Sequence, residues 1–134
     1  MPLTTAVLRE IPLFSSLSEE ELNELVPLFQ ERSYAPKHEI TKEGRPGFGF
    51  FVIESGSAKV TVRGEEQTTL GPGSYFGEIA LLDDGPRLGT VTTEGSLTAQ
   101  MLSPREFRPL VKANPNLAWG LLQGLWRILG REDD

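Results

Sequence analysis

The sequence predicts an α+β fold, in which an antiparallel β-roll, jelly-roll-like in form, is flanked by N-terminal and C-terminal helices. Eleven of the fourteen glycines lie between Gly44 and Gly95, so turns are concentrated in the middle of the 134-residue chain. Short β-branched segments with a two-residue period run between those turns, whereas both ends follow helical spacing. The length suits one domain over residues 1–134. We divide it into N-terminal helices at 1–32, the roll at 33–103 and C-terminal helices at 104–131.

The N-terminal segment contains a helix with a capping-box signature. Ser18 is followed three residues later by Glu21, the spacing at which each side chain can bond the other residue's backbone N–H. Pro27 is expected to kink or shorten this helix. A short helix and an apolar elbow at 11–14 precede it. The apolar residues after the cap share one helical face: Leu22, Leu25, Val26 and Phe29.

Seven strands are predicted for the roll. They cover residues 33–35, 39–42, 49–54, 57–63, 65–70, 87–93 and 97–103. Glycine-containing turns separate most of them, as is typical of hairpins.

Helical spacing returns after the roll. Pro104 suits the first position of a helix, and Asn114 with Pro115 opens a last helix that reaches about residue 129. The apolar residues of this last helix span about 200° of its circumference, whereas a helix on one core needs little more than about 100°. Either a partner chain or ligand covers a second face, or the helix is wedged between parts of its own domain.

Charge and composition exclude several classes of protein. The net charge of -6 disfavours binding to nucleic acid and to anionic membranes. No apolar run is long enough to span a membrane, and the N-terminus lacks the features of a signal peptide, so we expect a cytoplasmic protein. The chain has no cysteine and one histidine, His38, which disfavours a metal site and nucleophilic catalysis. We therefore expect neither an enzyme nor a bound cofactor or metal.

Residues 76–91 contain the candidate binding chemistry. Gly77 permits close approach of the backbone, and the short helical turn predicted at 78–82 would offer unpaired N–H groups to an anion. Arg87 begins the next predicted strand and places a guanidinium near those groups. One arginine with a few N–H groups suits a small anion carrying one or two charges.

This segment resembles the phosphate-binding cassette of cyclic nucleotide-binding domains. The resemblance rests on the motif Phe-Gly-Glu-Ile-Ala-Leu-Leu at 76–82, followed by four residues, Arg87, and then Leu-Gly-Thr-Val. The family includes catabolite-activator-like regulators and regulatory subunits of protein kinase A. The resemblance covers nearly the whole chain, including the segments 11–14, 43–44 and 51–56.

The resemblance implies roles for individual residues. Glu78 would accept a hydrogen bond from the ribose 2′-hydroxyl, and Arg87 would pair with an exocyclic oxygen of the cyclic phosphate. Each also has a structural alternative, because Glu78 could simply favour a helix N-terminus and Arg87 could be a solvated strand residue. In the family, the C-terminal helix or a residue at its end covers the base, so Trp126 and Arg131 are candidates here. The predicted ligand-binding residues are thus Gly77, Glu78, Ile79, Ala80, Arg87, Leu88, Trp126 and Arg131.

The resemblance predicts a stand-alone sensor that couples binding of a cyclic nucleotide to repositioning of its C-terminal helix. Leu88 lacks the hydroxyl that cyclic-GMP-selective members often have here, so cyclic AMP is the expected ligand and cyclic GMP the lesser candidate. A partner protein or a second copy of the chain would contact the C-terminal helix. The alternative is a nucleotide-free interaction or dimerisation module with the same fold. The bulk of Leu88 favours this alternative, and the Glu78–Arg87 pair opposes it.

Overall fold

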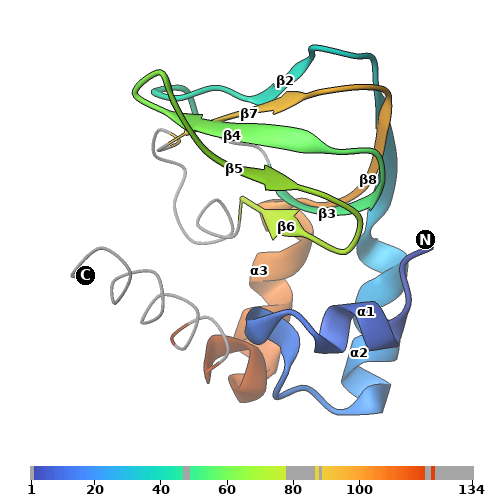
Figure 1. Cartoon of the computed structure of the whole chain (residues 1–134). Coiled ribbons are helices and arrows are strands. Elements are labelled where there is room, and N and C mark those ends of the chain that lie inside the picture. Colours follow the sequence, from blue (N-terminus) through green and yellow to red (C-terminus); the bar gives the residue numbers. More distant parts are fainter. Residues whose placement is uncertain (1, 47–48, 78–86, 88, 120–121, 123–134) are drawn as a thin grey trace. The chain divides into compact units, whose positions relative to one another are not determined.

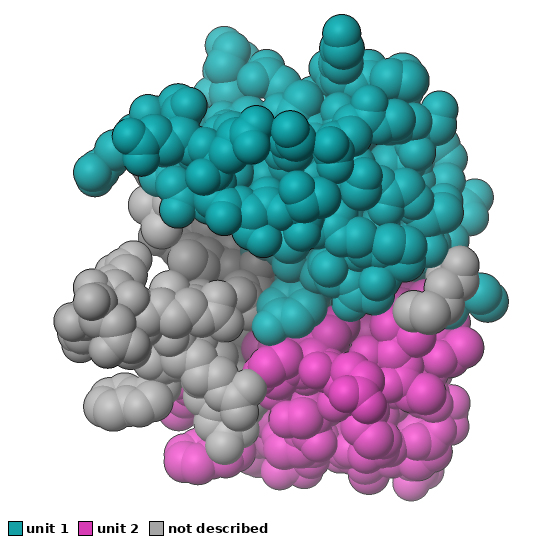
Figure 2. Space-filling view, viewed as in Figure 1, with its two compact units in different colours: residues 1–2, 29–104 teal, residues 3–28, 105–134 magenta. Residues whose placement is uncertain are grey.

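The computed structural model describes residues 2–46, 49–77, 87, 89–119 and 122, and it divides into two compact units, shown in different colours in Figure 2. Unit 1 comprises Met1–Pro2 and Phe29–Pro104. Unit 2 comprises Leu3–Leu28 and Arg105–Asp134. The predicted roll therefore falls in unit 1, and the predicted terminal helices fall mainly in unit 2.

Unit 1 is built from two four-stranded antiparallel sheets (Figure 1). The first sheet has the order β1 (Gln30–Tyr34), β8 (Leu97–Leu102), β3 (Phe50–Ser55) and β6 (Tyr75–Phe76). The second has the order β2 (Glu39–Thr41), β7 (Thr90–Thr93), β4 (Ala58–Val62) and β5 (Glu65–Leu70). This arrangement confirms the predicted antiparallel roll.

Three strands differ from the prediction by more than a residue at one end. β1 begins at Gln30, so the roll starts earlier than residue 33. β6, which pairs with β3, was not predicted because it is only two residues long. The strand predicted at 87–93 begins at Thr90, while Arg87 forms an isolated parallel bridge with Glu43.

A buried apolar cluster joins the strands of unit 1. The rings of Phe51 on β3 and Phe76 on β6 stack with centroids 4.9 Å apart. Burial of such side chains is the main stabilising contribution to a core of this kind. The buried members of the cluster are Phe51, Ile53, Ala58, Phe76, Val91, Leu97 and Ala99.

The buried residue Thr93 on β7 forms hydrogen bonds to the turn between β1 and β2. The hydroxyl of Thr93 accepts a hydrogen bond from the backbone N–H of His38 at 2.8 Å and donates to the carbonyl of Ala35 at 2.7 Å. The backbone of Thr93 bonds Lys37 and His38 at 3.0 and 2.9 Å. Because these four bonds converge on one residue, Thr93 holds the turn in place.

Unit 2 contains short helices, and the capping box is present. The helices are α1 (Thr5–Arg9), the 3-10 helix η1 (Pro12–Phe14), α2 (Glu19–Leu25), the 3-10 helix η2 (Val26–Leu28) and α3 (Pro104–Ala113), of which only Pro104 belongs to unit 1. Ser18 and Glu21 bond each other's backbone N–H at 3.1 and 2.8 Å. As expected, α2 ends before Pro27, and Pro104 is the first residue of α3.

The core of unit 2 is centred on two phenylalanines. Phe14 and Phe107 are fully buried and meet edge to face with ring centroids 6.3 Å apart. Residues 115–119 and 122 are helical, and the remainder of the predicted last helix lies outside the described residues. Within the described part of that helix, Trp119 is 57% exposed and Leu122 is 59% exposed.

Candidate functional site

The backbone of Arg87 is held by the segment that follows β2. Its N–H donates to the carbonyl of Arg45 at 2.8 Å, and its carbonyl accepts the N–H of Gly44 at 2.9 Å. Arg87 also forms an isolated parallel bridge with Glu43 in the same segment. The start of the arginine side chain is therefore fixed by two hydrogen bonds.

The guanidinium of Arg87 is partly buried and incompletely paired. Nη2 donates to the carbonyl of Gly49 at 2.7 Å. Nε is buried and has no hydrogen-bond partner among the described residues, nor does any described carboxylate form an ion pair with this side chain. Burial lowers the pKa of Arg87, yet an arginine keeps its charge at neutral pH. A bound anion would satisfy both the free donor and the charge.

Gly77 lies against this guanidinium. Its φ of +86° is one that L side chains rarely adopt. A Cβ at Gly77 would lie 2.5 Å from the carbonyl oxygen of Gly49 and 2.8 Å from Nη1 of Arg87. Glycine is therefore required both by the backbone conformation and by the close packing beside the charged group.

The structure brings together two of the predicted site residues, Gly77 and Arg87. The other six lie outside the described residues and stay predictions: Glu78, Ile79, Ala80, Leu88, Trp126 and Arg131. The predicted helical turn at 78–82 lies outside them as well.

Sequence reasoning missed Gly49, whose carbonyl holds the guanidinium. A Cβ at Gly49 would lie 2.8 Å from Cγ of Met101 and 3.1 Å from the carbonyl of Leu102. A glycine immediately before an apolar strand is a signal of such close approach. That signal could have identified a packing constraint at Gly49, although it could not have identified Arg87 as the bonded residue.

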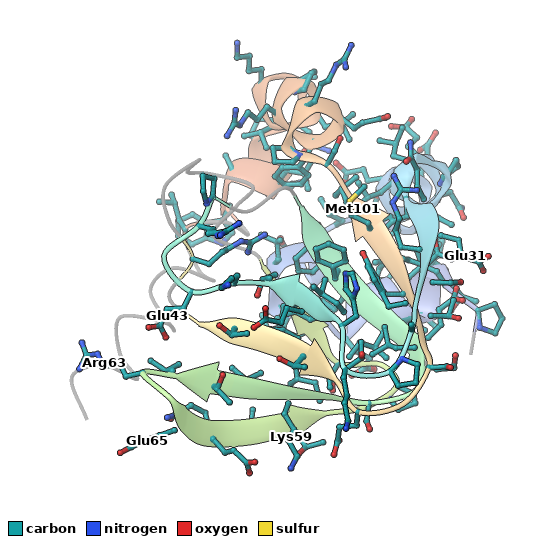
Figure 3. All side chains as sticks on the ribbon, turned by 90° about the horizontal axis from the view of Figure 1, so that it is seen from above. Glu31, Glu43, Lys59, Arg63, Glu65 and Met101 are labelled. Atoms are coloured by element: carbon teal, nitrogen blue, oxygen red, sulfur yellow. The ribbon has the colours of Figure 1, made fainter. Side chains whose placement is uncertain are left out.

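A cavity of about 600 Å³ also lies in unit 1, and Arg87 is one of its lining residues. Its volume is within the range of small-molecule sites. The other lining residues are Tyr34, Glu39, Ile40, Thr41, Lys42, Arg45, Pro46, Phe51 and Met101, the last of which is labelled on β8 in Figure 3. Gly77 does not line this cavity.

Two other kinds of feature are absent from the described part of the chain. No group of three or more His, Cys, Asp or Glu residues there could hold a metal ion. Over the same residues, no helix is long and apolar enough to cross a membrane.

The two antiparallel sheets define a β-roll, and a partly buried arginine, Arg87, lies in it with an unpartnered Nε among the described residues. The chain belongs to the cyclic nucleotide-binding domain family, because the pattern of that family, described as "Cyclic nucleotide-binding domain", matches residues 31–114. The predicted resemblance is thereby confirmed.

Individual relatives agree with this assignment. The N-terminal domain of a transcriptional regulator from Streptomyces coelicolor A3(2) has 31% identity and a TM-score of 0.78, covering 96% of this chain and 92% of that one. The regulatory domain of Toxoplasma gondii PKA, solved with cAMP, has 32% identity and a TM-score of 0.70, covering 78% and 42%. The cAMP-dependent protein kinase regulatory subunit of Yarrowia lipolytica is 39% identical over 106 residues, which are 78% of this chain but only 28% of that subunit.

Proposed function

We propose that this chain binds a cyclic nucleotide, with cyclic AMP as its main ligand, and that Arg87 pairs with the cyclic phosphate. The observation that carries the proposal is the buried Nε of Arg87, which has no hydrogen-bond partner among the described residues. The relative from Toxoplasma gondii was solved with cAMP, and the one from Yarrowia lipolytica is named for dependence on it, which supports this choice of ligand.

The phosphate would meet a guanidinium that is already in place. Gly49 and the bridge to Glu43 hold Arg87 before any ligand arrives, so little side-chain entropy is lost on binding. Gly77, without a side chain, leaves the N–H groups that follow it free to approach the phosphate. In this proposal the N–H groups of Ala80 and Leu88 complete the anion site.

The rest of the nucleotide would be bound by the remaining predicted residues. Glu78 would accept a hydrogen bond from the ribose 2′-hydroxyl, and Ile79 belongs to the same helical turn. Trp126 or Arg131 would cover the base. Repositioning of the last helix would then transmit binding to a partner protein, because a ligand shifts a conformational equilibrium only by its difference in affinity for the two states.

Thermal unfolding of nucleotide-free protein tests the proposal. Cyclic AMP at about 1 mM, bound with micromolar affinity, adds about 4 kcal/mol to the free energy of unfolding, which raises the Tm by about 10 °C for a domain of this size. We expect a smaller shift with cyclic GMP and none with 5′-AMP. Arg87→Ala should abolish the shift.

A matched control is available in unit 1. Arg63 is exposed and projects outward from the turn between β4 and β5 (Figure 3). Arg63→Ala removes the same charge and should retain the full shift with cyclic AMP. The proposal fails if wild-type protein shows no shift with any cyclic nucleotide, or if Arg87→Ala keeps the shift.

The exposed apolar face of the last helix favours a second candidate function, dimerisation. Trp119 and Leu122 are each more than half exposed, and three-residue spacing places them on one side of the helix. Sedimentation velocity over a range of protein concentrations tests this candidate. A dimer that the double variant Trp119→Gln with Leu122→Gln converts to a monomer would support it, and a wild-type monomer at about 100 µM would exclude it.

A further inference from the structure

The 600 Å³ cavity of unit 1 is lined by residues of two edge strands, one from each sheet. β1 is one of the two outer strands of the first sheet, and β2 is one of the two outer strands of the second. Tyr34 on β1 and Ile40 on β2 both line the cavity, together with Phe51 on β3 and Met101 on β8. Of the two nucleotide-site residues that the structure describes, Arg87 lines this cavity and Gly77 does not.

The floor of this cavity is apolar. Tyr34, Ile40 and Met101 are only partly buried, and they pack against the core cluster that includes Phe51. Thr41 also lines the cavity, but its hydroxyl donates to the carbonyl of Gly89 at 3.3 Å. The floor is thus core surface that the strands leave uncovered, and burying it beneath an apolar ligand is favourable.

The rim of the cavity is basic. Among the described lining residues, Lys42, Arg45 and Arg87 contribute three cations, against the one carboxylate of Glu39. Glu39 lies 4.0 Å from Nζ of Lys42. Arg45 is exposed and forms no ion pair with any described residue. In a chain of net charge -6, this concentration of positive charge favours an anionic ligand locally.

We propose that this cavity binds a small amphiphilic monoanion, namely an alkyl carboxylate. The alkyl chain lies on Tyr34, Ile40 and Met101, and the carboxylate pairs with Arg45, whose guanidinium can bind both carboxylate oxygens at once. The carboxylate pairs with Arg45 rather than Arg87, and none of the side chains named for the alkyl chain is a predicted nucleotide-site residue, so the inference does not depend on the proposed function.

Calorimetric titration of the whole chain with decanoate tests the inference. We expect saturable binding of one decanoate per chain, with weaker binding of hexanoate because it buries fewer methylene groups. Decyltrimethylammonium has the same alkyl chain with the opposite charge, and it should not bind. Saturating cyclic AMP should leave the decanoate affinity unchanged.

Two variants locate the site, and a third serves as control. Arg45→Gln keeps the backbone carbonyl that bonds Arg87 and should weaken decanoate binding about fivefold, the order expected for one exposed ion pair. Ile40→Thr keeps a β-branched residue on β2 and should also weaken binding. Arg63→Gln removes an equivalent charge away from the cavity and should bind decanoate like wild type. Circular dichroism and the Tm establish that each variant is folded.

Four results would overturn the inference. They are absence of decanoate binding, equal binding of decyltrimethylammonium, equal weakening by Arg45→Gln and Arg63→Gln, and displacement of decanoate by cyclic AMP. Displacement would assign decanoate to the nucleotide site, whereas failure of the nucleotide proposal alone would leave decanoate binding intact.

Discussion

The carboxylate of Glu21 accepts a hydrogen bond from Nδ2 of Asn114, which lies 93 residues further along the chain. The same carboxylate completes the capping box by accepting the N–H of Ser18 at 2.8 Å. Oδ1 of Asn114 in turn accepts the N–H of Asn116 at 3.0 Å. The Glu21 side chain thus connects the start of α2 to Asn114, the residue between α3 and the helix that follows it.

This connection predicts that stability depends on pH through Glu21. The hydrogen bond from the Ser18 backbone, followed by that from Asn114, lowers the pKa of Glu21 below its ordinary value of 4.5. A lowered folded pKa stabilises the protein above the unfolded pKa, and this stability is lost as the pH falls through the folded value. We expect Glu21→Gln to be less stable than wild type at pH 6 and to lose less stability between pH 6 and pH 3.

Urea unfolding at pH 6, 4.5 and 3 measures this difference. Glu20→Gln is the control, because the carboxylate of Glu20 lies on the same helix and forms no hydrogen bond with a described residue. Parallel pH profiles for wild type and Glu21→Gln would contradict the prediction.

Gly77→Ala should destabilise unit 1 and disturb Arg87. The positive φ and the short distances to Gly49 and Arg87 leave no room for a methyl group, so we expect a loss of about 1–3 kcal/mol in the free energy of unfolding. Gly71→Ala is the matched control, because its Cβ would meet nothing within 4 Å. Chemical denaturation distinguishes the two, and equal stability of both variants would show that the backbone at Gly77 adapts without cost.

Thr93→Val should show how much the hydrogen bonds of the Thr93 hydroxyl contribute to the free energy of unfolding. Valine has nearly the same shape, but it leaves the N–H of His38 and the carbonyl of Ala35 without the partners that the Thr93 hydroxyl provides. Such loss costs about 1–3 kcal/mol. Thr92→Val on the same strand removes a hydroxyl that bonds no described residue, and the free energy of unfolding should change little. A similar effect of both substitutions would mean that the Thr93 bonds contribute nothing specific.

Phe107→Ala should be the most destabilising of these changes. Phe107 is fully buried and meets Phe14 edge to face. Truncating a buried phenylalanine removes about 3–5 kcal/mol, which is a large part of the stability of a small domain. Thermal and urea unfolding should both show this loss of free energy of unfolding. A loss below about 1 kcal/mol would mean that the surrounding side chains move in to fill the cavity.

Features encoded by local patterns could be predicted from the sequence. The capping box of Ser18 with Glu21 depends on a fixed spacing, and the start of α3 at Pro104 depends on a fixed φ and a missing N–H. β1 was recognised only in part, because four of its five residues are exposed and give no alternation of apolar and polar side chains. The two residues of β6 are too few to establish any period.

The candidate site shows the same limit. Arg87 and Gly77 were found because a contiguous motif carries them. The bond from Arg87 to Gly49 joins residues 38 positions apart, and no spacing in the sequence encodes it. The basic rim around Arg45 was missed for a similar reason, since its cations come together only when Arg87 bonds the segment that follows β2.

The unpartnered Nε of Arg87 has a consequence for the evolution of this domain. Keeping a charged guanidinium partly buried without a counter-ion among the described residues works against folding of the empty protein. Methionine is apolar and similar in length to arginine. Arg87→Met is therefore expected to raise the Tm of the ligand-free chain while removing the group proposed to bind phosphate. Selection for thermostability alone would favour losing this arginine, so only continued selection for ligand binding would retain it.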